Sequence, residues 1–476
     1  MKRIWLIASW VALSAACAAT ACSSNDDDKP TGDTGAGGEG NAGSGGKSSA
    51  GKTSSESGAD TGENGGVPGG VAGEPSDVAG GGGAGGAAGS DTGGSTGQIA
   101  SCSTGKVFAG NPLFDGDTAD IGTSVDGQGL RDDPPLRSEA LAFAGNNVFI
   151  ETETEIWTSD LSVAKPKLTR VAGEEAAGDD AFLEAGKACA DTHFLVIRDM
   201  VAKANGKLAV VDYIGNAVIE LSDPGSPDCT SEYVAGTHAK SPDPGSAYPV
   251  LPGDVDGPGA EALFGNADNH GSVFRIATDT DNNLYVWDNG NAKFKMIANE
   301  DDADRTVTTV GVVSQDDNIL GLTFLKGKLY ATGVDGSNDF LLEIDPAKYD
   351  ADDPTANVKE VFRERNHFPD DVESSHQAVL SQLTTDGEAL IVTGQSGFIW
   401  RVATNGKVLG TLAGTGVHLG YDGGFDPTEA HPANEWQLAY SASNSNGGPW
   451  LAVNGSKLYW SGGYSVGMHV VGFDCE

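Results

Sequence analysis

The stretch Gly271–Asn299, GSVFRIATDTDNNLYVWDNGNAKFKMIAN, decides the fold. Residues 274–278 alternate with a period of two, which places one set of side chains on each face of a sheet. Residues 281–283 and 288–291 are rich in Asn, Asp and Gly, which tolerate the backbone angles of tight turns. Between these turns, residues 284–287 form an apolar run of β-forming residues. The stretch therefore predicts three short strands joined by two turns.

Weaker copies of this unit recur along the rest of the chain. Each copy has an apolar strand, a turn of Gly, Asn or Asp, and a second apolar strand. In the six copies the second strands begin at Val148, Leu208, Leu284, Leu329, Leu390 and Leu458. Most copies continue to a fourth strand that ends in small residues, as at 169–173 and 232–236. Four strands in each of six units predict an all-β fold, a six-bladed β-propeller over residues 101–476.

The first hundred residues cannot contribute to this core. Residues 1–21 combine a basic start, an apolar run and small residues, as a secretory signal peptide does. Residues 19–22, Ala-Thr-Ala-Cys, resemble the lipobox of bacterial lipoproteins, which implies a lipid on Cys22; cleavage without lipidation is the alternative. Residues 22–100 are rich in Gly, Ser, Ala, Thr and Asp, which predicts a disordered tether.

These features predict the location of the protein and a class of partner that it does not bind. A lipid on the N-terminus would hold the chain on a membrane of the bacterial envelope, and we expect the outer membrane or the cell surface. The formal net charge is −39. Such a surface repels phosphate backbones, so we expect no nucleic-acid partner. We expect a monomer.

Residues 254–310 resemble the NHL-repeat family. The motifs that carry the resemblance are Asp256-Gly257-Pro258-Gly259, Ala262-Leu263-Phe264 and Asn283-Leu284-Tyr285-Val286-Trp287-Asp288. Asn282 stands where the family has Gly, and Trp287 where it has Ala. The resemblance implies a six-bladed propeller, and it implies no activity, because this fold carries binding modules and enzymes alike.

The ends of the chain predict how the ring closes. Residues 106–110 read as an isolated fourth strand, whereas the last unit ends with its third strand at 468–473. The N-terminal strand should therefore complete the last blade and leave no open edge between the first and last blades. Four cysteines follow the tether, and they allow three pairings. Closure places Cys102 beside Cys475, and it leaves Cys189 to pair with Cys229.

Candidate metal ligands are few. His193, His270 and His376 each precede a first strand, and first strands line the central channel of a propeller. These histidines would then converge as a zinc set, with local surface-loop hydrogen bonding as the alternative. Residues 254–257 and 279–282 carry acidic groups that could chelate calcium, although turn chemistry also explains them.

Asp199, Arg275 and Gln382 occupy equivalent first-strand positions, so we expect them to line the channel. A mixed polar channel suits ligand binding, and it also suits a water-filled pore. Residues 101–476 contain neither a zinc-protease motif nor a P-loop motif. The leading hypothesis is a non-enzymatic binding module for a protein, peptide or glycan. The alternative is an extracytoplasmic metal-dependent lyase or lactone hydrolase with its site in the channel.

Overall fold

The computed structural model describes fourteen segments of the chain, and the structural statements below concern them alone. They are residues 98–110, 140–152, 154–173, 187–236, 251–266, 273–298, 305–336, 338–364, 367–368, 380–394, 397–416, 429–438, 450–461 and 469–476. All belong to one compact unit, Gly86–Glu476. The helices among them are single 3₁₀ turns, and none is long and apolar enough to cross a membrane.

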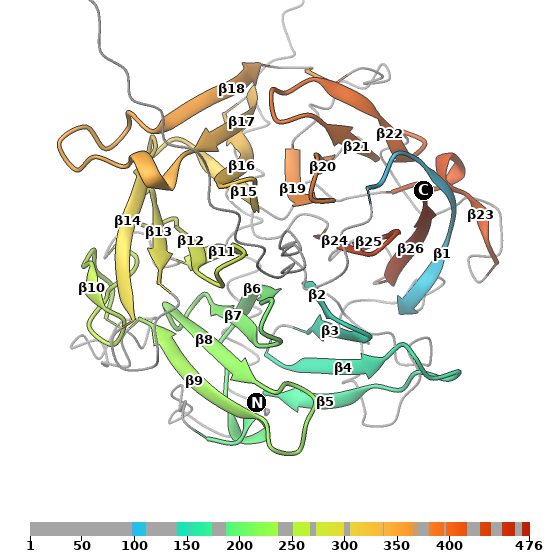
Figure 1. Ribbon diagram of the computed structural model, residues 1–476, viewed down its shortest axis with the longest axis horizontal. Coiled ribbons are helices and arrows are strands. Elements are labelled where there is room, and N and C mark those ends of the chain that lie inside the picture. The colour runs from blue at the N-terminus through green and yellow to red at the C-terminus, as the bar shows by residue number, and fades with distance from the viewer. Residues whose placement is uncertain are drawn as a thin grey trace, which may run out of the picture. The chain divides into compact units, whose positions relative to one another are not determined.

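Six antiparallel blades surround a common axis (Figure 1). Blade 1 contains β2 (Leu141–Ala144), β3 (Asn147–Glu151), β4 (Ile156–Asp160) and β5 (Thr169–Ala172). Blade 2 contains β6 (Ile197–Ala202), β7 (Leu208–Asp212), β8 (Ala217–Ser222) and β9 (Thr230–Ala235). Blade 3 contains β11 (Val273–Thr278), β12 (Leu284–Asp288), β13 (Lys293–Ile297) and β14 (Thr306–Val312).

The other three blades follow the same order. Blade 4 contains β15 (Asn318–Leu325), β16 (Lys328–Asp335), β17 (Asn338–Ile344) and β18 (Val358–Glu364). Blade 5 contains β19 (Leu380–Thr385), β20 (Leu390–Gly394), β21 (Phe398–Val402) and β22 (Val408–Gly414). Blade 6 contains β24 (Trp450–Asn454), β25 (Lys457–Ser461), β26 (His469–Cys475) and β1 (Cys102–Gly110). The predicted six-bladed propeller is confirmed.

The core lies between the blades. The innermost strands β2, β6, β11, β15, β19 and β24 contact one another in sequence, and β24 contacts β2 to complete the ring. Side chains on facing sheets interdigitate: Val211 and Val218 of blade 2 share a buried cluster with Ile276 and Val286 of blade 3. Each such side chain contributes about 1.5–3 kcal/mol by its burial.

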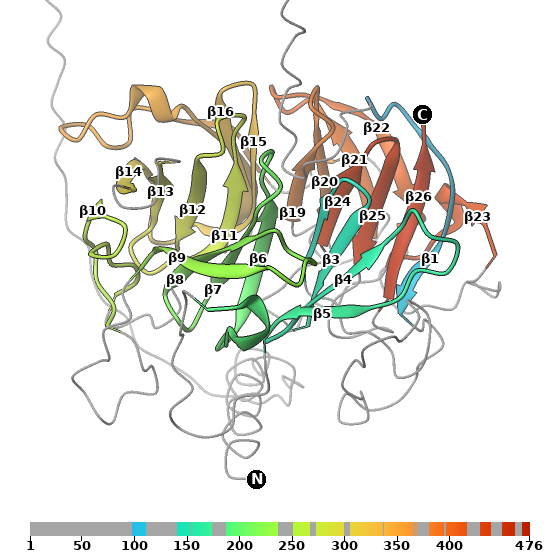
Figure 2. The ribbon, with the colours of Figure 1, turned by 60° about the horizontal axis from the view of Figure 1, so that its bottom comes forward.

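The ring closes through the N-terminal strand, as the sequence predicts. β1 pairs antiparallel with β26, and Cys102 lies opposite Cys475 in that register. Figure 2 shows β1 beside β26. A disulfide joins Cys102 to Cys475, and a second joins Cys189 to Cys229. Both predicted pairings are confirmed.

Two short strands extend the outer edges of blades 3 and 6. β10 (Gly257–Pro258) pairs with β14, and β23 (His431–Pro432) pairs with β1. The sequence analysis interprets the segment around Gly257 as a turn or a calcium loop, whereas the structure uses it to cover a strand edge. Covering an edge removes unpaired backbone groups that would otherwise recruit another strand.

The ring has two different faces. Short turns join the first and second strands of each blade on one face, as at 145–146 and 203–207. The connections from blade to blade run from the opposite face and are mostly long, as at 173–196, 236–272 and 415–449. The chain enters on the face of the short turns, because the Ile99 amide donates to Asp386 Oδ2 in the β19–β20 turn. We call these the turn face and the connection face.

Candidate functional site

Polar and aromatic side chains gather on the axis where the inner strands begin, toward the connection face. We call this group the axial cluster. Six members are linked by their contacts, namely Arg198, Asp199, Tyr213, Phe274, Arg275 and Trp450. We add Gln382, which holds the equivalent position on β19, the inner strand next to β24. Its members come from blades 2, 3, 5 and 6. A blade core packs with apolar side chains, so a charged group on the axis needs partners of its own.

Arg275 crosses the axis and is fully buried. Its Nε donates to the Leu320 carbonyl oxygen of blade 4 at 2.5 Å, and its Nη1 lies 3.5 Å from the Arg198 carbonyl oxygen of blade 2. Its guanidinium carbon lies 4.4 Å from the ring centre of Phe274 and 5.6 Å from that of Trp450. One cationic side chain therefore contacts four of the six blades.

Asp199 lies beside Arg275 on the neighbouring blade. Its Oδ1 accepts from the Met200 amide at 2.9 Å, and its Oδ2 accepts from the Ile276 amide at 3.2 Å. Burial raises the pKa of Asp199 to about 6, and the positive charge of Arg275 opposes that shift. The carboxyl group thus joins blade 2 to blade 3.

Gln382 and Trp450 each present an N–H group without a partner in the described structure. Gln382 is 5% exposed; its Oε1 accepts from the Leu383 amide, while its Nε2 has no hydrogen-bond partner. Trp450 is 4% exposed, and its Nε1 also has no partner. A buried donor left unpaired costs about 1–3 kcal/mol, so two of them on one axis require an explanation.

The sequence analysis predicts Asp199, Arg275 and Gln382 as channel residues, and it makes no such prediction for Trp450. The structure places the Trp450 ring against Arg275 on the axis. A signal exists in the sequence: Trp450 directly precedes Leu451, just as Gln382 precedes Leu383 at the start of an equivalent strand. The residue before each of these leucines therefore occupies the same position in its own blade.

The proposed zinc set is only partly within the described residues. His193 is partly buried on the segment that leads into β6. His270 and His376 lie outside the described residues. Among the residues that are described, no group of three or more His, Cys, Asp or Glu side chains is arranged to hold a metal ion. The zinc hypothesis therefore stays a prediction.

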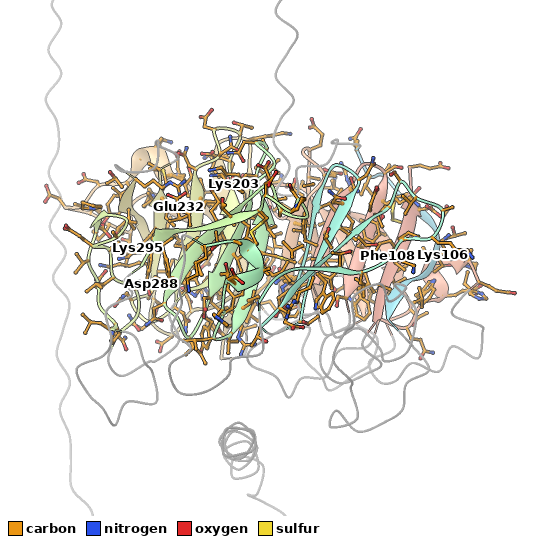
Figure 3. The ribbon with its side chains drawn as sticks, turned by 90° about the horizontal axis from the view of Figure 1, so that it is seen from below. Lys106, Phe108, Lys203, Glu232, Asp288 and Lys295 are labelled. Atoms are coloured by element: carbon orange, nitrogen blue, oxygen red, sulfur yellow. A yellow bond between two sulfur atoms is a disulfide. The ribbon has the colours of Figure 1, made fainter. Side chains whose placement is uncertain are left out.

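The first candidate calcium loop, 254–257, surrounds an internal cation. Lys295 is fully buried, and its Nζ lies 3.1 Å from Asp254 Oδ1 and 3.1 Å from Asp256 Oδ1. It also lies 3.9 Å from Asp288 Oδ2. Figure 3 shows Lys295 and Asp288 on blade 3. Burial raises the pKa of Asp288 to about 6, with Asn291 and Lys295 opposing the shift. An ammonium group thus occupies the place where a bound cation would lie.

In the second candidate calcium loop, 279–282, the Asp279 carboxylate forms hydrogen bonds within the turn. Asp279 Oδ1 accepts from the amides of Asp281 and Asn283, each at 2.9 Å. Its Oδ2 accepts from the Tyr285 hydroxyl at 3.0 Å. These are the bonds by which Asp stabilises a tight turn. Calcium binding stays a prediction, and in both loops the carboxylates pair with other groups of the protein.

A cavity of about 520 Å³ opens on the turn face between blades 1 and 2, and Lys203 lines it. Burial lowers the pKa of Lys203, although the Glu220 carboxylate 2.7 Å away opposes that shift. Glu220 is itself fully buried and also binds Lys207 at 2.6 Å and Arg305 at 3.3 Å. Glu220 is the shared counterion of these three cations, and Arg305 also pairs with Glu232 at 3.4 Å, so we interpret the network as structural.

The comparisons with known proteins find similarity in solved structures alone: no protein-family model and no curated protein matches the chain. Virginiamycin B lyase from Staphylococcus aureus is 13% identical, with a TM-score of 0.38; the match covers 71% of this chain and 95% of that one. PQQ-bound aldose sugar dehydrogenase from Streptomyces coelicolor is 13% identical, with a TM-score of 0.37, over 80% of this chain and 100% of that one. A luciferin-regenerating enzyme is 14% identical, with a TM-score of 0.38, over 78% of this chain and 94% of that one. Likeness at this level transfers no activity, and the NHL resemblance stays a prediction.

Proposed function

We propose that this protein is a lipid-anchored, non-enzymatic binding module of the bacterial envelope, with its ligand site at the axial cluster. The observation that carries the proposal is the pair of unpartnered, buried N–H groups of Gln382 and Trp450. They lie at the start of two neighbouring inner strands, on the axis that Arg275 also reaches. Donors left unpaired in the unbound protein gain a partner when a ligand enters.

The two faces of the ring support the same function. The chain that leads to the tether joins the ring on the turn face, next to Asp386. The axial cluster lies toward the connection face, where the long segments between blades begin and end. Binding residues commonly lie on such connecting segments over a rigid scaffold.

We propose a peptide, protein or glycan as the ligand class and a monomer as the binding unit. The acidity of the chain, with a formal net charge of −39, disfavours nucleic acid. The closed ring supports a monomer, because β1 completes blade 6 and leaves no gap that a second copy must fill.

The test is a binding screen of the full chain on peptide and glycan arrays. Trp450→Ala removes an axial side chain, and Lys326→Ala changes an exposed side chain in the β15–β16 turn on the opposite face. We expect ligands that wild type and Lys326→Ala retain and that Trp450→Ala loses. Gln382→Leu, which keeps the size of the side chain, serves as a second axial variant if Trp450→Ala does not fold.

Two results would contradict the proposal. One is a wild-type protein that binds no array component, and the other is binding that the axial variants leave unchanged. Chemical conversion of a bound component would instead favour the metal-dependent lyase or lactone hydrolase. Mass analysis of the array eluate distinguishes conversion from binding.

A further inference from the structure

The donors of the axial cluster share one requirement. The Gln382 Nε2 and Trp450 Nε1 groups can only donate, and both are buried without a partner in the described residues. The guanidinium of Arg275 lies within 5.6 Å of the Trp450 ring, and it too can only donate. A ligand that serves the two unpartnered donors beside this cation must offer acceptor atoms close together.

We propose that the axial cluster binds the carboxylate group of its ligand, held between Arg275, Gln382 and Trp450. This inference rests on the proposed function and names the chemistry recognised at the same site. A carboxylate has two oxygens that accept about four hydrogen bonds and carries the charge that a guanidinium pairs best. A neutral carbonyl has one oxygen and carries no charge to pair with the guanidinium.

The charges of the cluster favour an anion over a cation. Arg198 and Arg275 bring two positive charges, and Asp199 is the acidic member of the cluster. Both oxygens of Asp199 already accept from backbone amides, so its capacity for a ligand cation is partly used. The named members thus carry two positive charges and one acidic group, in a chain with a formal net charge of −39. An anionic ligand is repelled by the acidic outer surface and attracted by the arginines at the axis.

Aromatic rings next to the donors provide contacts for the rest of the ligand. The rings of Tyr213 and Phe274 meet edge to face with their centres 5.8 Å apart. Arg198 lies over the Tyr213 ring at 5.1 Å, and Arg275 lies over the Phe274 ring at 4.4 Å. These pairs orient the guanidinium groups, and the rings offer apolar surface beside the charged centre. We therefore test carboxylates that carry a small apolar or sugar body.

Two biological sources offer this group, namely the C-terminus of a peptide and a uronic acid of a glycan. Isothermal titration of the full chain distinguishes them with matched pairs of probes. The peptide pair is N-acetyl-alanyl-alanine as the free acid and as the C-terminal amide. The sugar pair is glucuronic acid and glucose. We expect one acid to bind in the millimolar range or better, and its uncharged partner to bind at least tenfold more weakly.

Two conservative variants test the named donors. Gln382→Glu keeps the size of the side chain but replaces a donor with a negative charge, so we expect loss of acid binding by more than tenfold. Trp450→Phe keeps an aromatic ring beside Arg275 and removes only the N–H, so we expect about a tenfold loss. Lys326→Ala on the turn face should bind as wild type. Thermal unfolding of each variant shows that its fold is retained.

The outcomes separate this inference from the proposed function. Equal binding of an acid and its uncharged partner, or acid binding unchanged in Gln382→Glu, overturns the carboxylate assignment and leaves an axial binding module standing. The same holds if neither acid binds while arrays yield an uncharged ligand that depends on Trp450. Failure of every array component and every probe overturns both.

Discussion

Lys295 is a charged residue in a position where blade packing leaves it no access to water. Three carboxylates hold it: Asp254 and Asp256 at 3.1 Å, and Asp288 at 3.9 Å. A buried charge is tolerated only with such partners. The arrangement fastens the loop that contains β10 onto blade 3, since Asp256 Oδ2 also accepts from the Thr309 amide at 2.7 Å.

We predict that Lys295→Met lowers the free energy of unfolding by about 3 kcal/mol, because it leaves the Asp288 carboxylate buried without a cation. Lys293→Met is the matched control on the same strand. Lys293 is partly exposed and pairs with Asp254, so its loss should cost less than about 1 kcal/mol. Urea unfolding of both variants gives the comparison. Equal losses would show that the buried ion pairs do not stabilise the loop.

This residue also marks a limit of sequence reasoning. The carboxylates of 254–257 are visible in the sequence and suggest calcium, whereas the ammonium that meets them lies some forty positions away in the chain. Nothing in the local pattern indicates that Lys295 is fully buried whereas Lys293 stays partly exposed until the register of β13 is known. The contact is set by the sheet, and so it appears only in the structure.

At the scale of strands, the small residues that end the fourth strands have a packing reason. Gly236 follows β9 with φ of 101°, a conformation that favours glycine. A Cβ atom there would lie 2.8 Å from Ala217 Cα, at the start of β8. Gly173 and Gly414 end blades 1 and 5 in the same way, each against the start of the third strand. The glycine lets the outer strand close onto its neighbour.

We predict that Gly236→Ala destabilises the protein by about 3 kcal/mol, from backbone strain together with the clash at Ala217. Gly206→Ala separates the two causes. Gly206 has a similar φ of 86°, but no atom lies within 4 Å of an added Cβ. Its cost should be backbone strain alone, about 1 kcal/mol. Thermal unfolding of both variants measures these costs, and equal shifts in Tm would contradict the packing explanation.

The same feature explains which strands could be predicted. The sequence reveals the fourth strands of blades 1, 2 and 5 because each ends in such a glycine. It does not reveal β18, the fourth strand of blade 4, which reads VKEVFRE and is buried at Phe362 alone. An outer strand with one buried residue carries little periodic signal. Its place is fixed by pairing with β17.

At the scale of the whole molecule, the closure of the ring could be predicted from the sequence, whereas the meeting of side chains on the axis could not. A ring needs a partner for its last blade, so the unpaired strand at 106–110 and the positions of Cys102 and Cys475 suffice to predict the pairing that the structure shows. The meeting of Arg275 with Trp450 is different. It depends on side chains from opposite sides of the ring reaching one axis. No local sequence pattern encodes the distance between these two side chains.

The buried carboxyl groups of the propeller predict how its stability depends on pH. Burial raises the pKa of Asp212 to about 6, and backbone amides of Leu195, Gly215 and Val196 oppose the shift. Burial has the same effect at Asp199 and Asp288, each raised to about 6. In the unfolded chain these groups titrate near 3.8. Between these values the folded state binds more protons, so stability falls as pH rises through this window.

We therefore predict that the free energy of unfolding is higher at pH 5 than at pH 7.5, with Asp212 contributing about 1–2 kcal/mol of the difference. Relief of repulsion among the acidic surface groups acts in the same direction, so variants must separate the two effects. Asp212→Asn resembles the protonated group and should shrink the difference, whereas exposed Asp316→Asn should leave it unchanged. Urea unfolding at both pH values measures this. A stability that is flat or rises from pH 5 to 7.5 would show that these carboxyl groups ionise in the fold without a penalty.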